Sequence, residues 1–133
     1  MKEITVKAVD ENLGAIQDFI SVELESIQCP IKICRQFSIV AEELFANIAH
    51  YAYTGEAGFA VVRLGINGKE ITLEFEDMGL PYNPLEKPDP DITASAEERP
   101  IGGLGVYMVK KIMDTVRYCH DGGTNKLIMT KDM

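Results

Sequence analysis

The pair Asn67–Gly68 constrains the fold more than any other feature, because it lies between two β-rich segments, residues 59–66 and 70–76. An Asn-Gly pair favours a two-residue type I′ turn, whose twist matches that of antiparallel strands. In the second segment apolar and polar residues alternate, so its apolar residues share one face. The chain is therefore expected to contain an antiparallel hairpin with one buried face.

The other elements are predicted from the period of the apolar residues. Their order is strand, two helices, hairpin, a proline-rich loop over residues 79–100, helix and hairpin. This order lacks the strand–helix–strand alternation of a doubly wound fold. We expect an α+β two-layer sandwich, in which about three helices cover one face of a mixed, mostly antiparallel sheet. The predicted elements outside the first hairpin are the strand 2–8, the helices 11–27, about 31–53 and about 103–114, and the hairpin strands 115–120 and 124–131.

Length and charge restrict the class of protein. The 133 residues suit a single domain spanning 1–133. A formal net charge of −8 disfavours nucleic acid and anionic membrane surfaces as partners. The sequence shows no signal peptide and no apolar stretch long enough to span a membrane, so we expect a cytoplasmic domain. The odd number of cysteines (Cys29, Cys34 and Cys119) and their spacing predict free thiols.

Glu43 and Asn47 form the first candidate site, on the second predicted helix. They are four residues apart, so their side chains lie on one face, at the border of the apolar stripe. A carboxylate beside an amide could hold a metal ion and position a nucleophile. The alternative is an ordinary amphipathic boundary, since polar residues flank most apolar helical stripes.

Asp77 is the second candidate, because it continues the apolar register of the hairpin's second strand. The pattern points its carboxylate toward the buried face, which is costly unless the group accepts hydrogen bonds. A ligand with an exocyclic amine would supply them. The alternative is that the strand ends at Glu76 and Asp77 is a turn residue.

A glycine cluster, Gly102, Gly103 and Gly105, opens the third predicted helix. Glycines let backbone N–H groups approach a phosphate at a helix N-terminus. The spacing matches neither a P-loop nor the dinucleotide-binding GxGxxG pattern. Tight packing of helix on sheet explains the glycines equally well.

The combination and order of these sites resemble the Bergerat ATP-binding fold of the GHKL superfamily. The matching segments are EELFANIAHYAY (42–53) as the N box, DMGLPYNP (77–84) as the first glycine box and GGLGVYMV (102–109) as the second. Within the superfamily the chain is most similar to the short anti-sigma-factor serine kinases. A departure lies after the N-box asparagine, where these kinases often carry His-Ala-Tyr and this chain has Tyr51-Ala52-Tyr53, so His50 receives no role.

The resemblance implies ATP and Mg²⁺ as cofactors and assigns roles to individual residues. Asn47 would bind the Mg²⁺ that bridges the ATP phosphates, and Glu43 would be the general base. Asp77 would accept a hydrogen bond from the adenine amine, with Gly79 leaving room for the ring. The remaining implied nucleotide contacts are Gly103, Leu104 and Gly105 near the phosphates and Thr124 near the adenine, with residues 82–101 as the ATP lid. Arg99, just before the second glycine box, is a further candidate for a phosphate contact because of its positive charge.

The function that the resemblance implies is that of an ATP-dependent protein serine/threonine kinase. Its substrate would be an anti-anti-sigma (STAS-like) protein, a sigma factor would be a second partner, and the kinase would be a homodimer. The alternative is a non-catalytic module that binds a nucleotide and a regulatory protein without transferring phosphate. A histidine-kinase catalytic domain and a chaperone-like ATPase fit less well, because both need elements for which we expect too little chain.

Overall fold

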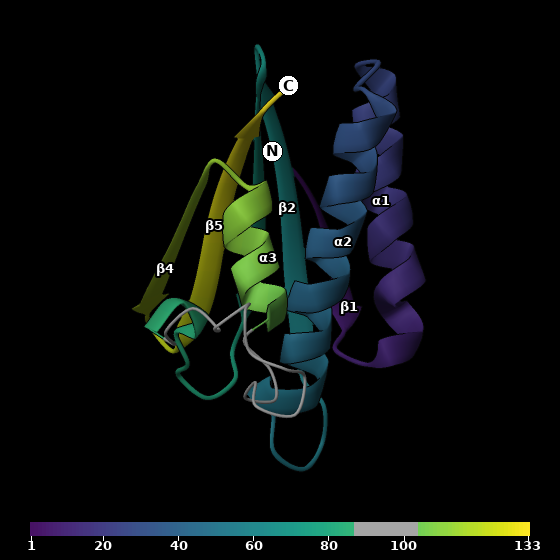
Figure 1. Ribbon diagram of the computed structural model, residues 1–133. Helices are drawn as coiled ribbons and strands as arrows, with labels where there is room; N and C mark the ends of the chain where they lie inside the picture. Colours follow the sequence, from purple (N-terminus) through teal and green to yellow (C-terminus); the bar gives the residue numbers. More distant parts are fainter. Residues whose placement is uncertain (87–103) are drawn as a thin grey trace.

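The computed structural model describes residues 1–86 and 104–133, which form a two-layer α+β sandwich (Figure 1). A 5-stranded sheet has the order β1-β2-β3-β5-β4, and the three α-helices lie on one of its faces. No helix in these ranges is long and apolar enough to cross a membrane. The strands are β1 (Lys2–Lys7), β2 (Phe59–Asn67), β3 (Glu70–Asp77), β4 (Thr115–Asp121) and β5 (Thr124–Asp132). The helices are α1 (Leu13–Ser26), α2 (Ile31–Asn47) and α3 (Leu104–Ile112), with short turns η1 (Asp10–Asn12), η2 (Ile48–Ala52) and η3 (Pro84–Glu86).

The predicted fold class is confirmed and the central hairpin forms, but its turn lies one residue later than the predicted pair Asn67–Gly68. Asn67 pairs with Glu70, so the two turn residues are Gly68 and Lys69. Gly68 has a left-handed φ of 63° and Lys69 does not, which is typical of a type II′ turn with glycine first and differs from the predicted type I′ turn. All neighbouring strands in the described sheet are antiparallel, so it has none of the parallel pairing that a mixed sheet contains. Strand β5 lies between β3 and β4, which brings the end of the chain beside the central hairpin.

The core lies between the sheet and the helices and follows the apolar periods of the sequence. Apolar residues of α1 and α2 repeat every three or four positions, so one stripe of each helix faces the sheet. Alternate residues of β2, β3 and β5 fill the other side of this layer. Fully buried members include Ile16, Leu24, Phe37, Val40, Val62, Leu73 and Met129.

The second predicted helix is not α-helical to its end. Helix α2 stops at Asn47, and the chain continues through Ala52 as a single π-helical turn, η2. A π turn is wider than an α turn and is frequent at functional sites. The carbonyl oxygen of Ala52 accepts a hydrogen bond from the backbone N–H of Leu80, at 2.8 Å. The end of this helical segment is therefore bonded to the loop that follows β3.

Free cysteines flank the corner between α1 and α2, as the sequence predicts. Cys29 and Cys34 are both partly buried, and the Cys34 thiol donates to the Cys29 carbonyl oxygen at 3.6 Å. Burial, reinforced by the neighbouring Cys34, raises the pKa of the Cys29 thiol to about 11. Cys119, on β4, is free and exposed.

We expect Cys29 to resist alkylation in the folded protein, because the thiolate is the reactive form. Raising the pKa from 9.0 to about 11 lowers the thiolate fraction at pH 8 roughly 100-fold. Iodoacetamide labelling followed by peptide mass spectrometry should show Cys29 reacting roughly 100-fold faster in urea than in buffer. Exposed Cys119 is the internal control, and equal labelling rates of both residues in the folded protein would contradict the expectation.

Candidate functional site

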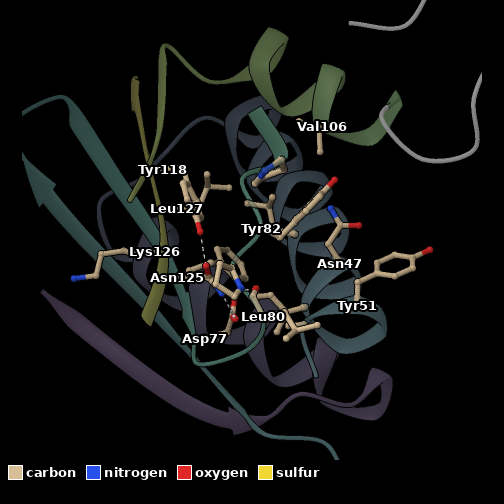
Figure 2. Close-up of a pocket in the computed structure, with 16 residues that line it drawn as sticks. Asn47, Tyr51, Asp77, Leu80, Tyr82, Val106, Tyr118, Asn125, Lys126 and Leu127 are labelled. Atoms are coloured by element: carbon tan, nitrogen blue, oxygen red, sulfur yellow. Dashed lines mark hydrogen bonds between the residues drawn. The ribbon is translucent and has the colours of Figure 1, made fainter. Parts of the chain in front are cut away.

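A cavity of about 360 Å³ opens at the end of the sheet where β3 stops and β5 begins. Its walls come from α2 and η2 on the helix side and from the sheet and the loop after β3 on the other (Figure 2). The lining is mostly apolar, with a few polar side chains that include Asn47, Asp77 and Asn125. An apolar cavity with a few convergent polar groups is the usual form of a small-molecule site.

Asp77 is the last residue of β3, and its side chain is buried, as the register argument predicts. Its Oδ1 accepts two hydrogen bonds, from the backbone N–H of Gly79 at 2.8 Å and from Asn125 Nδ2 at 3.0 Å. No hydrogen bond to Oδ2 is found from the described residues. The carboxylate is thus held through one oxygen, and the other is left to accept from a ligand.

Gly79 is required where the loop after β3 crosses the π turn. A Cβ at this position would lie nearer than 3.0 Å to the backbone carbonyl of Ala52, closer than side chains approach real neighbours. The next residue, Leu80, donates its N–H to the same carbonyl oxygen. The absence of a side chain at Gly79 therefore lets the loop pack directly on η2.

Tyr53 holds the same loop from the other side. Its hydroxyl donates to the carbonyl oxygen of Phe59 and accepts from the backbone N–H of Met78 at 3.0 Å. Burial raises the pKa of Tyr53, the Met78 bond opposes this, and the negative charge of Asp77 adds to the rise. The hydroxyl therefore stays protonated at neutral pH and keeps donating.

Asn47 and Glu43 project from α2 but do not meet the cavity equally. Asn47 lines the cavity, and its side chain has no hydrogen-bond partner among the described residues. Glu43 is not one of the lining residues. Its carboxylate lies against Gly105, where an added Cβ would overlap it. Gly105 therefore allows the start of α3 to approach α2 at Glu43.

Thr124, predicted to lie near the adenine, is at the turn end of β5, where it pairs with Asp121 and does not line the cavity. The neighbouring Asn125 lies opposite Asp77 and contacts it. The sequence contains a pattern that predicts an inward side chain at Asn125. Leu127 and Met129 occupy the buried face of β5, and two residues earlier in the same alternation is Asn125.

Several predicted positions lie outside the described residues. These are Arg99, Gly103 and most of the predicted lid, while Leu104 is the first residue of α3. Tyr82 and Pro84, from the described start of the predicted lid, line the cavity. His50 does not line the cavity. Its Nε2 contacts the Asp10 carboxylate at 2.9 Å on the exposed surface.

A family model described as the histidine kinase-like ATPase domain matches residues 6–131. The chain belongs to this family. Among curated proteins, the RsbW serine-protein kinases of Bacillus thuringiensis (strain Al Hakam) and Bacillus cereus (strain AH820) are 30% identical to it over 97 residues. The alignment covers 70% of this chain and 60% of those proteins. The chain thus spans about three-fifths of the length of these relatives.

Solved structures agree on the fold of this histidine kinase-like domain. The structure of the RsbU and RsbW domains of Rv1364c from Mycobacterium tuberculosis matches 99% of this chain and 32% of its own, with a TM-score of 0.64 at 12% identity. The Acinetobacter baumannii histidine kinase AdeS matches 100% of this chain and 69% of its own, with a TM-score of 0.53 at 16% identity. At such identities the likeness establishes the fold.

We expect Gly79→Ala to lower stability by about 1–3 kcal/mol, because the added methyl group overlaps the Ala52 carbonyl. Gly14→Ala on α1 is the matched control, since nothing lies within 4 Å of its added Cβ. That control should be neutral or slightly stabilising. Urea unfolding of both variants measures the difference, and equal midpoints would show that the loop yields to the side chain.

Proposed function

We propose that this chain is an ATP-binding protein serine/threonine kinase of the anti-sigma-factor type. The observation that carries the proposal is the convergence of Asp77 and Asn47 on one apolar cavity from opposite walls. Asp77 offers a buried hydrogen-bond acceptor for a nucleotide base. Asn47 offers an amide oxygen, without a partner among the described residues, for a metal ion bound to phosphate. The similarity to proteins named serine-protein kinase supports phosphoryl transfer to a protein.

In this proposal the adenine enters the apolar part of the cavity, and its amine donates to Asp77. Gly79 keeps the adjoining wall flat, since its missing side chain brings the loop against η2. Gly103, Leu104, Gly105 and Arg99 would bind the phosphates, and residues 82–101 would form the lid over them. The whole of residues 1–133 would then be one ATP-binding domain.

The residues present fit Mg²⁺ as a second cofactor. Mg²⁺ prefers oxygen ligands and often uses one or two from the protein, with phosphates and waters completing its shell. The Asn47 amide lines the cavity without a partner among the described residues, so its oxygen is available for this purpose. When bound, the ion would neutralise phosphate charge, which matters in a chain of net charge −8.

Glu43 would act as the general base. It would accept the proton of a serine hydroxyl on the partner while the serine oxygen bonds to the γ-phosphorus and the bond to the ADP oxygen breaks. Such a base typically contributes about 10²–10⁴-fold to the rate. The contact between Glu43 and Gly105 supports this role, because it holds the carboxylate at the start of the helix assigned to the phosphates.

The protein substrate would be an anti-anti-sigma (STAS-like) domain, with a sigma factor as a second partner in the cytoplasm. The acidic balance of the chain supports protein partners over nucleic acid. A homodimer is part of the same proposal. Strand β1 supports it as an edge strand, with one side unpaired among the described strands.

The second candidate is a non-catalytic module that binds a nucleotide and sequesters a regulatory protein. The position of Glu43 outside the cavity lining favours it, because a base must reach the proton it accepts. The two candidates share the nucleotide site and differ only in phosphoryl transfer.

We expect Asn47→Ala to weaken ATP binding at least tenfold in the presence of Mg²⁺, because it removes the proposed metal ligand. In EDTA the variant and the wild type should bind ATP equally weakly. Isothermal titration calorimetry measures both affinities. A variant that retains wild-type affinity with Mg²⁺ would overturn the assignment of Asn47.

We expect Glu43→Gln to keep ATP affinity within a few-fold and to lower phosphoryl transfer about 100-fold or more. The exposed neighbour Glu42 provides the matched control, since Glu42→Gln makes the same chemical change on another face of α2. Transfer of label from γ-³²P-ATP to a STAS domain encoded beside this chain is the readout. ATP binding by the wild type with no transfer to any such domain would favour the module.

A further inference from the structure

Asn125 and Asp77 are the two buried polar residues among those the structure describes, and they contact each other. Asn125 is central to a network that joins β5, β4 and the loop after β3. Its Nδ2 donates to Asp77 Oδ1 at 3.0 Å and to the carbonyl oxygens of Gly79 and Leu80 at 3.2 and 2.9 Å. The hydroxyl of Tyr118, on β4, donates to its Oδ1 (Figure 2).

The chemistry of these partners fixes the orientation of the Asn125 amide. Its three partners on one side, a carboxylate and two carbonyl oxygens, are all acceptors, so the NH₂ group must face them. The amide oxygen then faces the Tyr118 hydroxyl, which can donate to it. A flipped amide would bring its oxygen against the carboxylate and both carbonyls.

Tyr118 keeps its proton and so remains a donor. Burial raises the pKa of its hydroxyl, a backbone hydrogen bond from Tyr82 opposes this, and the negative charge of Asp77 raises the pKa further. At neutral pH the chain of donors therefore runs in one direction, from Tyr118 to Asn125 to Asp77.

The hydrogen bonds at Asp77 determine which of its carboxylate oxygens remains to accept from a ligand. Oδ1 already accepts from Asn125 and from the Gly79 N–H, whereas no described residue donates to Oδ2. Any orientation that turns the carboxylate away from these two donors loses both hydrogen bonds, so the group is held with one oxygen toward Asn125 and Gly79 and the other away from them. Oδ2 is thus a fixed acceptor.

We propose that Asn125, held by Tyr118, is a positioning residue that makes the site selective for a 6-aminopurine over a 6-oxopurine. The inference rests on the proposed nucleotide-binding function. An exocyclic amine donates to the fixed Oδ2, whereas a carbonyl oxygen in its place sets two acceptors against each other. A site built on buried hydrogen-bonding groups rejects a ligand that leaves them unpaired.

The test compares the affinities of ADP and IDP, which share sugar and phosphates and differ at the 6-substituent and the adjacent ring nitrogen. Calorimetry with Mg²⁺ gives both dissociation constants for the wild type, Tyr118→Phe and Asn125→Leu. We expect the preference of the wild type for ADP to fall about fivefold in Tyr118→Phe, which loses the hydrogen bond that orients Asn125 together with the bond from the Tyr82 backbone. In Asn125→Leu, which loses the whole hydrogen-bond network, the preference for ADP over IDP should fall further.

The control is Tyr107→Phe, the same change on α3, where the ring contacts Lys111 and does not line the cavity. Its ADP-to-IDP ratio should equal that of the wild type. If Asn125→Leu does not fold, Tyr118→Phe alone decides, because the phenyl ring retains the packing.

The outcomes separate this inference from the proposed function. A wild type that prefers ADP and variants with an unchanged ratio would overturn the role of Asn125 and leave nucleotide binding intact. Equal losses of affinity for both nucleotides would also overturn it, because they indicate a structural role only. A wild type that binds neither nucleotide would overturn the proposed function and the inference together.

Discussion

The burial of the Asp77 carboxylate is the constraint on which the cavity depends. An inward carboxylate is costly unless hydrogen bonds replace its lost water. Here the loop turns back at once so that the Gly79 N–H reaches it, and β5 supplies the amide of Asn125 opposite. The antiparallel pairing of β3 with β5 is therefore as important to the site as the motif residues themselves. It joins residues 48 positions apart in the chain.

The helix side of the cavity depends on the same loop. The π turn η2 directs the Ala52 carbonyl toward Leu80, and Gly79 has no side chain to obstruct the approach. The wall that carries Asn47 is thereby bonded to the wall that carries Asp77. A ligand that bridges the two residues would meet a framework already in place, which reduces the ordering cost of binding.

The acidic side chains of the chain are distributed differently on the open face of the sheet and at the cavity. Part of the charge is neutralised on the open face of the sheet, where Arg63 contacts Glu3, Glu74 and Glu76. The side chains that line the cavity are different, since they include an aspartate and two asparagines among mostly apolar residues. Such a site suits a base amine and a metal-bound phosphate better than a bare anion.

The sequence by itself determined the central hairpin, the two-layer fold and the shared face of Glu43 and Asn47. These follow from local periods of two and 3.6 residues, which a chain carries without its neighbours. The tertiary structure decided that Asp77 points inward and that Asn125 is its partner. Strand register across a sheet depends on distant segments, and a shift of one residue exchanges the buried and exposed faces. The π turn after Asn47 was likewise beyond local pattern, and its last carbonyl, that of Ala52, is bonded to Leu80, far along the chain.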